Sequence, residues 1–366
     1  MRVLVAPDAF KGTLTAAEAA RAVTAGWREV RPHDELALLP LADGGEGTLD
    51  ALAAADPSLR RLPVPRVHGP CGDPVDADLL LGADGTAVVE LARSSGLPLA
   101  PRPDPLGATT RGVGEVVLAA LEAGAARVVV AVGGSASTDG GAGLLRALGL
   151  RVLDAQGDEL PDGGAALARA AVLDASGLAP PPPGGVAVLT DVRNPLLGAQ
   201  GAAAVFAPQK GADPGQVRLL EDALGRWAQL CGGDPDLPGA GAAGGAAYGL
   251  AALWGAQLVS GSAHVADLAG FDAALAAADL VLTGEGRFDR TSLGGKVCGE
   301  VLRRARAARV PAGVVCGARG SGTDGVPDVR TVALAELAGD LGAALADPAG
   351  WARRAGAEAA RRWGGG

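Results

Sequence analysis

Residues 132–143 read Val-Gly-Gly-Ser-Ala-Ser-Thr-Asp-Gly-Gly-Ala-Gly, and this glycine-rich stretch separates two regular segments. The preceding residues 127–132 form a β-branched run that is typical of a buried strand. The following residues 142–148 have the composition of a helix. A strand that leads through a short loop into a helix predicts an α/β fold.

The chemistry of this loop suits an anion. Its glycines let the backbone approach a ligand closely, and its hydroxyl and carboxylate side chains lie beside a helix N-terminus, where free N–H groups favour negative charge. The loop therefore predicts phosphate binding, and an ordinary turn with Asp139 capping the helix is the alternative. The candidate phosphate-binding residues of the loop are Gly133, Gly134, Ser135 and Asp139.

The first strand-to-helix crossing of the chain repeats this arrangement. Residues 2–6 predict a strand, and Thr15 with Glu18 forms a capping box that opens a helix to about residue 30. Asp8 and Lys11 lie between them, at the carboxyl edge of the expected sheet, where ligands bind in open α/β folds. A surface loop with a local ion pair is the alternative.

A second crossing joins a strand at residues 35–39 to a short helix that ends at residue 55. Asp43 and Glu46 stand among glycines in this loop, where carboxylates can orient a hydroxyl, accept its proton or hold Mg²⁺. Helix capping is the alternative function of both side chains.

The middle of the chain predicts a second, β-rich domain. Short strands alternate with turns from residue 60 to residue 91, and residues 152–160 resemble a hairpin. Helices are expected at residues 112–124, 214–230 and 241–253. After a strand at residues 185–189 comes a polar cluster that consists of Asp191, Asn194, Gln209 and Lys210.

The last third returns to a simple α/β pattern. A strand is expected at residues 279–283, followed by a loop over residues 284–292, a helix that ends near residue 308 and a strand at residues 312–316. The loop and the start of the helix contribute a third group of candidate residues, Glu285, Asp289 and Lys296.

Composition limits the function. At 366 residues the chain exceeds a usual single core, which predicts two domains. A net charge of −9 argues against a nucleic acid or an anionic membrane as partner. Four cysteines without a CxxC pair, and the lack of a long apolar segment, favour a reducing cytoplasm.

Lysine is rare in this chain. Among 32 Lys and Arg residues, only Lys11, Lys210 and Lys296 are lysines, and all three lie in glycine-bearing loops. This bias suggests that lysine remains where a compact ammonium is required, and chance placement in loops is the alternative.

Several familiar chemistries are excluded by the motifs. Val297 follows Lys296 where a Walker loop needs Ser or Thr, and two formal GxGxxG matches lack a strand-to-helix context. The three histidines are isolated, without an HExxH or GxSxG motif. Carboxylates, lysines and backbone amides remain, and these groups suit phosphoryl transfer.

Taken together, six loops closely resemble the type I glycerate kinase family. They are the stretches Ala-Pro-Asp-Ala-Phe-Lys-Gly at residues 6–12, Ala-Asp-Gly-Gly-Glu-Gly-Thr at 42–48, Gly-Gly-Ser-Ala-Ser-Thr-Asp-Gly-Gly at 133–141, Asp-Val-Arg-Asn-Pro at 191–195, Ala-Val-Phe-Ala-Pro-Gln-Lys-Gly at 204–211, and Ala-Asp-Leu-Val-Leu-Thr-Gly-Glu-Gly-Arg at 278–287 with Gly295 and Lys296. The six stretches follow one another in the same order as in the family, and together they span the chain. Ala9 replaces the family's usual Ser, and Arg193 its usual Asp.

The resemblance implies a flavodoxin-like domain, also described as Rossmann-like, built from residues 1–62 and 262–366, with a second α/β domain inserted at residues 63–261. It implies phosphorylation of D-glycerate by ATP with Mg²⁺, usually at the 2-hydroxyl in bacterial members. Kinases for another small hydroxy acid or for the 3-hydroxyl, and a non-catalytic phosphometabolite-binding protein, are the alternatives.

The resemblance also suggests which residues form the site, with the small molecules D-glycerate and ATP as substrates. Lining one cleft, the catalytic candidates are Asp8, Lys11, Asp43, Asp191 and Lys296. The candidates for binding substrate or phosphate are Glu46, Gly133, Gly134, Ser135, Asp139, Asn194, Gln209, Lys210, Glu285 and Asp289.

Overall fold

A computed structural model of the protein describes residues 1–322 and 329–363, and the chain divides into two units. Unit 1 comprises Met1–Asp43, Asp50–Pro57 and Ser260–Gly366, so both ends of the chain belong to it. Unit 2 comprises Gly44–Leu49 and Ser58–Val259. The α/β fold class predicted from the sequence is confirmed, with one unit formed by both chain ends and the other by the chain between them.

Unit 1 is built on a parallel sheet of five strands in the order β13-β12-β11-β1-β2. Counted along the chain this is the order 2-1-3-4-5 read from the other edge, which is the flavodoxin-like arrangement. The strands are β1 (Arg2–Val5), β2 (Glu35–Leu38), β11 (Leu280–Phe288), β12 (Ala312–Arg319) and β13 (Arg330–Ala333).

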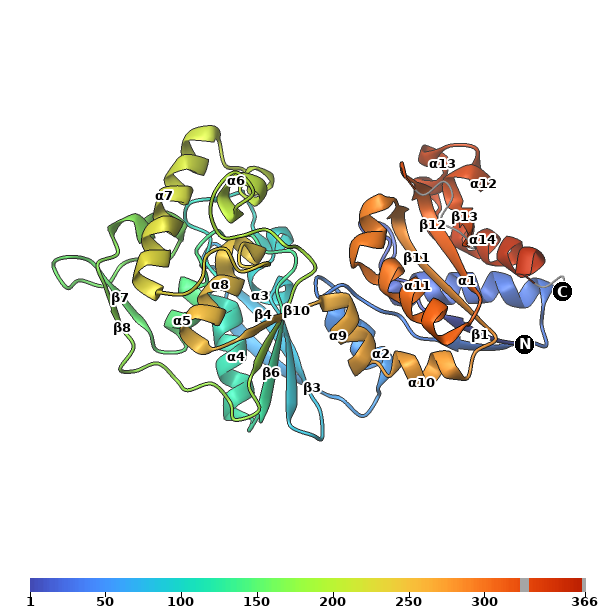
Figure 1. Cartoon of the computed structure of the whole chain (residues 1–366), viewed down its shortest axis with the longest axis horizontal. Coiled ribbons are helices and arrows are strands. Elements are labelled where there is room, and N and C mark those ends of the chain that lie inside the picture. The colour runs from blue at the N-terminus through green and yellow to red at the C-terminus, as the bar shows by residue number, and fades with distance from the viewer. Residues whose placement is uncertain (323–328, 364–366) are drawn as a thin grey trace. The chain divides into compact units, whose positions relative to one another are not determined.

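Helices cover both faces of this sheet, because successive side chains of a buried strand point to opposite sides. Val3 and Val5 of β1 pack with α1 and α14, while Leu4 packs with α9, α10 and α11 (Figure 1). The helices are α1 (Ala16–Val30), α9 (Gly261–Leu268), α10 (Phe271–Ala276), α11 (Val297–Ala308) and α14 (Pro348–Trp363).

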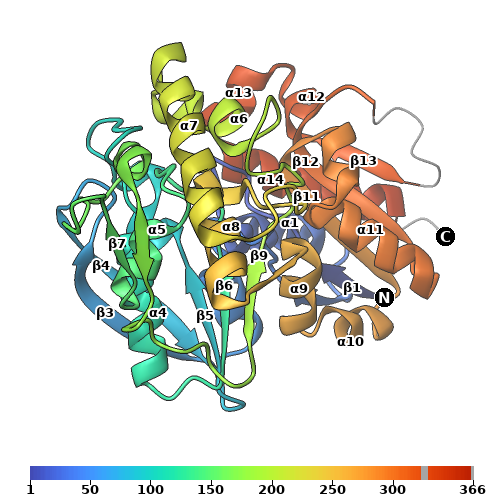
Figure 2. The same ribbon diagram turned by 60° about the vertical axis from the view of Figure 1, so that its left-hand side comes forward.

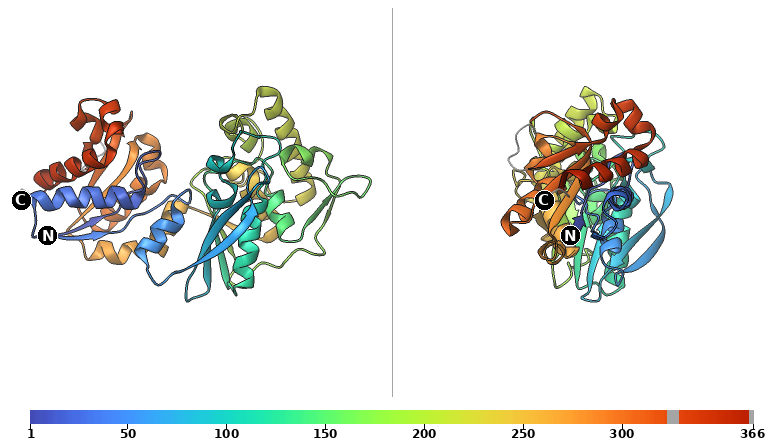
Figure 3. Two further views of the ribbon diagram at one scale, coloured as in Figure 1. Left: turned by 180° about the vertical axis from the view of Figure 1, so that it is seen from behind. Right: turned by 90° about the vertical axis from the view of Figure 1, so that its right-hand side faces the viewer.

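Helix α1 starts at the predicted capping box. The Thr15 hydroxyl accepts from the backbone N–H of Glu18 at 3.2 Å, and the Glu18 carboxylate accepts from the backbone N–H of Thr15 at 2.9 Å. The helix lies side by side with α14 (Figure 3), and glycines on both helices let their backbones touch. A Cβ at Gly356 would overlap the carbonyl oxygen of Val23.

Gly356→Ala is therefore expected to destabilise the protein by about 1–3 kcal/mol, as an overpacked core does. Gly225 in the middle of α7 (Pro214–Cys231) is the matched control, because a Cβ there meets no atom within 4 Å. Gly225→Ala should instead raise stability by up to about 1 kcal/mol through helix propensity. Urea denaturation of both variants measures the two changes, and equal stabilities would contradict the contact.

Unit 2 contains a mixed sheet of six strands in the order β10-β9-β6-β5-β4-β3. The pairs from β5 to β10 are parallel, and β3 and β4 extend the sheet antiparallel. The strands are β3 (Arg60–His68), β4 (Pro74–Leu81), β5 (Thr86–Glu90), β6 (Arg127–Ala131), β9 (Val186–Leu189) and β10 (Gln257–Val259). A separate pair consists of β7 (Arg151–Leu153) and β8 (Val172–Asp174).

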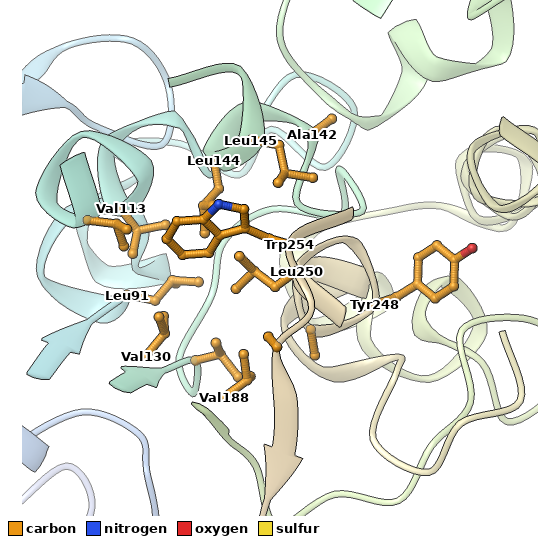
Figure 4. Packing of buried hydrophobic residues seen from close by; sticks show 14 of the residues in the cluster. Leu91, Val113, Val130, Ala142, Leu144, Leu145, Val188, Tyr248, Leu250 and Trp254 are labelled. Carbon is orange, nitrogen blue, oxygen red and sulfur yellow. The ribbon is translucent and has the colours of Figure 1, made fainter. Parts of the chain in front are cut away.

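One face of the six-stranded sheet carries the main core of unit 2. Helices α4 (Arg111–Glu122), α5 (Ala142–Ala147), α7 and α8 (Ala242–Trp254) contribute to this core (Figure 2). Trp254 lies in it with Leu144 and Leu250 (Figure 4), and its indole N–H donates to the carbonyl oxygen of Ala179 at 2.8 Å. Thus the few aromatic side chains fill the space that small alanines and valines leave.

The remaining helices of the described residues are short. They are α2 (Thr48–Ala55), α3 (Ala92–Ser95), α6 (Ala202–Phe206), α12 (Leu334–Ala338), α13 (Leu341–Ala346) and four 3₁₀ turns at Leu97–Leu99, Gly164–Arg169, Pro208–Lys210 and Arg290–Gly294.

The hairpin expected at residues 152–160 is confirmed. Leu153 bridges antiparallel to Glu159, and the backbone N–H of Leu160 donates to the carbonyl oxygen of Val152 at 2.9 Å, while β7 also pairs with β8. One local prediction needs correction. The helix expected at residues 241–253 is interrupted near its start, because Ala243, Gly244 and Gly245 have positive φ.

Candidate active site

The parallel sheet of unit 1 reverses its strand order between β1 and β11, and ligands of open α/β sheets bind at such switch points. A pocket of about 290 Å³ lies there, close to the lower limit of about 300 Å³ for small-molecule sites. The loop after β1 contributes Asp8 and Lys11, and the end of β11 contributes Glu285. Lys296, just before α11, lines the same pocket.

Asp8 is the most strongly perturbed carboxylate of this pocket. Only 5% of the residue is exposed, and its Oδ1 accepts from the backbone N–H of Ala9 at 2.7 Å. Burial raises the pKa of Asp8 to about 7. The negative charges of Asp43 and Glu285 also raise this pKa, whereas the positive charge of Lys11 lowers it. Asp8 can therefore take up and release a proton near neutral pH.

The two lysines of the pocket differ in their partners. The Lys11 ammonium lies 3.1 Å from Oδ2 of Asp43. Burial acts to lower the pKa of Lys11, but the charges of Asp43 and Asp8 outweigh it and raise that pKa, so Lys11 stays charged. Within residues 1–322 and 329–363, the Lys296 ammonium has no hydrogen bond or ion pair, although its charge acts on Glu285. Lys296 is thus available for an anion.

Glu285 lies in a strand, which corrects the loop expected at residues 284–292. Strand β11 continues to Phe288 because it pairs with β12 up to Arg319. The Glu285 side chain is buried, and its Oε1 has no hydrogen-bond partner in the described part of the chain. Burial raises the pKa of Glu285, against the opposing effects of Ser292, Cys298 and Lys296. A buried acceptor without a donor is costly unless a ligand satisfies it.

Asp289 has a structural partner. Its Oδ1 accepts from the backbone N–H of Thr291 at 2.8 Å and from the Thr291 hydroxyl at 2.6 Å, which caps the following 3₁₀ turn. These bonds lower the pKa of Asp289 and keep it ionised. The capping function accounts for its place in the loop.

The glycine-rich loop of unit 2 packs against a second glycine-rich loop. The backbone N–H of Gly133 donates to the carbonyl oxygen of Gly44 at 3.1 Å, and a Cβ at Gly133 would lie 2.5 Å from the Cα of Gly45. Gly134 and Glu46 are exposed on these two loops. They are the predicted residues that a ligand of unit 2 can reach there.

The polar side chains behind Gly134 face inward. Ser135 is buried, and its Oγ lies 2.9 Å from that of Ser137 and accepts from the Ser137 backbone N–H at 3.0 Å. Fully buried Asp139 accepts from the backbone N–H and the hydroxyl of Thr110, both at 2.8 Å, and from the N–H groups of Gly141 and Gly143. The side chain of Asp139 thus caps helix starts, which is the alternative that the sequence left open.

Lys210 supports the same loop from within. It is 3% exposed, and its ammonium donates to the carbonyl oxygen of Ser137. Burial lowers the pKa of Lys210 to about 8, and the charge of Asp139 limits the decrease. Lys210 therefore holds the loop from behind instead of lining an open surface.

The other polar residues predicted in unit 2 lie in the loops after β9. Asp191 and Asn194 are partly exposed, and the Asn194 amide donates to the carbonyl oxygen of Gln200 at 2.8 Å. Gln209 is exposed in the 3₁₀ turn at Pro208–Lys210.

Sequence reasoning missed Glu90, which fixes the loop around Glu46. Its carboxylate, 2% exposed at the end of β5, accepts from the backbone N–H groups of Gly47 and Leu49, both at 3.0 Å. The signal was available, because residues 86–90 read Thr-Ala-Val-Val-Glu, a strand-like run that ends in one charged residue. Sequence reasoning also missed Ser94 and Ser95, whose buried hydroxyls have no hydrogen-bond partner among the described residues.

A magnesium site fits the pocket of unit 1 only with help from a ligand. In the described ranges, no three His, Cys, Asp or Glu side chains gather closely enough to hold a metal ion. Magnesium is usually held by one or two carboxylates together with phosphate oxygens and water. The Oε1 of Glu285 is an oxygen donor that meets this need.

A switch-point pocket that contains a carboxylate with a pKa of about 7 and two lysines, in an α/β protein of two units, suits a kinase for small molecules. The sequence model of the glycerate kinase family matches residues 3–364. The chain belongs to the glycerate kinase family.

Individual relatives agree with this assignment. The chain is 42% identical to the glycerate 2-kinase of Escherichia coli (strain K12) over 335 residues, which cover 89% of this chain and 87% of that protein. It is 42% identical to the glycerate kinase of Bacillus subtilis (strain 168) over 320 residues, 85% and 83% of the two chains. A crystal structure from Salmonella typhimurium LT2 that carries the name glycerate kinase 2 has a TM-score of 0.82, 40% identity and coverage of 99% and 98%.

As a kinase the protein uses a nucleotide. No helix within residues 1–322 and 329–363 has the length and apolar character that crossing a membrane requires.

Proposed function

We propose that the protein transfers the γ-phosphoryl group of ATP to the 2-hydroxyl of D-glycerate, which yields 2-phosphoglycerate and ADP. Family membership supports glycerate as the acceptor, and the name of the Escherichia coli relative supports the 2-hydroxyl. The observation that carries the chemistry is buried Asp8, whose pKa is about 7, in a pocket that also contains Lys11 and Lys296.

Asp8 is the general base in this proposal. It accepts the proton of the glycerate hydroxyl while that oxygen forms a bond to the γ-phosphorus and the bond to the bridging oxygen of ADP breaks. A base with a pKa near the working pH is suited to this transfer, which contributes about 10²–10⁴-fold to the rate. Asp8 therefore sets the lower pH limit of activity.

Lys11 and Lys296 neutralise the phosphate oxygens as charge moves to the leaving group. Asp43 fixes the position of the Lys11 ammonium through the 3.1 Å ion pair. Mg²⁺ would be held by Glu285 and the phosphate oxygens, where it would reduce the negative charge of the transferred group.

The other candidate residues for binding substrate or phosphate belong to unit 2. Glu46 and Gly134 are exposed on its packed glycine loops, and Asp191, Asn194 and Gln209 lie in the polar loops after β9. Ser135, Asp139 and Lys210 maintain the shape of the loop that presents Gly134. We take the two units as the two domains of the protein.

We also assign the protein to the cytoplasm. Cys71, Cys231, Cys298 and Cys316 are all described, and each is a free thiol. Free thiols are the normal state of cysteine in a reducing compartment.

The function is tested by assays of ADP release with D-glycerate, tartronate and erythronate as acceptors, followed by ³¹P NMR of the product. The proposal requires the highest kcat/KM with D-glycerate and a phosphorus signal coupled to the single proton at C2. Coupling to the two protons at C3 would identify 3-phosphoglycerate and overturn the assignment of the hydroxyl.

The pH dependence tests Asp8 as the base. At saturating magnesium and ATP, kcat/KM for glycerate should rise with pH around 7, because only ionised Asp8 accepts the proton. Asp43→Asn removes a charge that raises the Asp8 pKa, so the rise should move to lower pH. An unmoved midpoint would contradict the assignment.

Other charged or titratable groups near Asp8 also contribute to the pH profile of this experiment. They are Lys11, Glu285, Lys296 and Cys298. Asp222→Asn on the exposed side of α7 is the control, and its pH profile should equal that of the unmodified protein.

A further inference from the structure

The pocket of unit 1 has two chemically different ends. Its charged end contains Asp8, Lys11, Glu285 and Lys296, which the proposed chemistry uses. Its other end is apolar and is formed by α12, α13 and the start of α14. The apolar lining consists of Leu334, Leu341, Ala344, Leu345 and Pro348.

Two leucines of this apolar end are unusually exposed. Leu341 is 51% exposed and Leu345 is 53% exposed, the highest values of any large hydrophobic side chain in the described ranges. Four positions apart on α13, they share one side of the helix, whereas Ala344 is buried in the core of unit 1. Apolar side chains that gather on a pocket mark a binding site.

The chemistry of the two substrates decides which one this wall can take. This step rests on the proposed function, in which the substrates are glycerate and ATP. Each carbon of glycerate carries oxygen, so glycerate offers no apolar face. Adenine has two flat, largely apolar faces, and the polyphosphate that follows it matches the lysines at the other end of the pocket.

We propose that Leu341 and Leu345 form the wall that binds the adenine ring of the nucleotide, with its phosphates directed toward Lys11 and Lys296. The nucleotide then occupies the switch point of the unit 1 sheet. The two leucines determine selectivity for a nucleoside phosphate over an inorganic phosphate chain.

The test compares two ligands that share a diphosphate and differ in adenosine. Isothermal titration measures the binding of ADP and of pyrophosphate to the full chain and to the double variant Leu341→Ser with Leu345→Ser. The affinity for ADP should fall about tenfold or more, and the affinity for pyrophosphate should stay unchanged. Leu219→Ser, at a 40% exposed leucine of α7, is the control and should bind both ligands normally.

Every other outcome contradicts the proposal that Leu341 and Leu345 bind adenine. Equal losses for ADP and pyrophosphate would assign the two leucines to the fold or to the phosphate-binding part of the pocket instead of to adenine, and thermal melting separates these two functions. Unchanged ADP binding would exclude adenine from this surface. Since binding needs no turnover, a protein that binds ADP in this way but phosphorylates no glycerate would refute the proposed function and leave the adenine site standing.

Discussion

Asp8→Asn should lower kcat for glycerate phosphorylation by at least about a hundredfold, the lower bound for loss of a general base. The amide keeps the size of the side chain and its hydrogen bond from Ala9, but it cannot take the hydroxyl proton. Initial rates at saturating substrates measure the loss. Asp222→Asn, which changes an exposed carboxylate of α7 in the same way, should keep the normal rate.

The same variant should become more stable at alkaline pH. Folding raises the pKa of Asp8 from 3.8 to about 7, so ionised Asp8 destabilises the native state. Its favourable contribution is complete below about pH 4 and is lost as the pH rises through about 7. Relative to the unmodified protein, Asp8→Asn should therefore gain stability at pH 8 and lose that gain toward pH 4.

Activity and stability measured together exclude misfolding as the reason for the loss of activity in Asp8→Asn. A misfolded variant would lose activity and stability together, whereas removal of a buried base loses activity and gains stability at pH 8. Normal turnover in Asp8→Asn would transfer the base function to Glu285 of the pocket or to Asp43, the ion-pair partner of Lys11.

At least one of the variants Lys11→Arg and Lys296→Arg should lose about a hundredfold or more in kcat. A preorganised contact to the transferred group is worth about 3–4 kcal/mol. Arginine keeps the charge, but its planar fork is larger and prefers a different geometry. Rates at saturating ATP and glycerate measure the effect.

The reverse substitution Arg290→Lys, at an exposed residue after β11, is the control and should be neutral. If both Lys→Arg variants retain the normal rate, the rarity of lysine has no catalytic meaning. The charge of the phosphoryl group would then be balanced by Mg²⁺ and backbone amides.

The sequence allowed candidate residues to be placed where they stand next to clear local signals for a strand or a helix. Asp8 and Lys11 could be placed because they follow a short buried strand and precede a capping box, and these signals are local. Glu285 was expected in a loop but lies in strand β11. Its glycine neighbours are typical of a loop, and only the pairing of β11 with β12 extends the strand through them.

The direction of a side chain could not be read from the sequence. Asp139 and Lys210 belong to ligand-like motifs, yet they turn toward Thr110 and Ser137 inside unit 2. The two exposed leucines of α13 that line the pocket of unit 1 were also missed, because α13 is too short to show a periodic pattern. Both features depend on contacts between segments that are distant in the chain.

The packing of α1 against α14 has a consequence for the order in which the protein can form during synthesis. Helix α1 is complete at Val30, but its partner α14 begins at Pro348, so α1 leaves the ribosome long before α14. Chains are synthesised at about 5–20 residues per second, and domains generally fold as units. Unit 2 is fully synthesised when Val259 has emerged, while β1 and α1 must wait with their apolar faces uncovered. The segment that carries Asp8 and Lys11 is thus made long before α14, the helix that covers it, and reaches its final place only after α14 has been made.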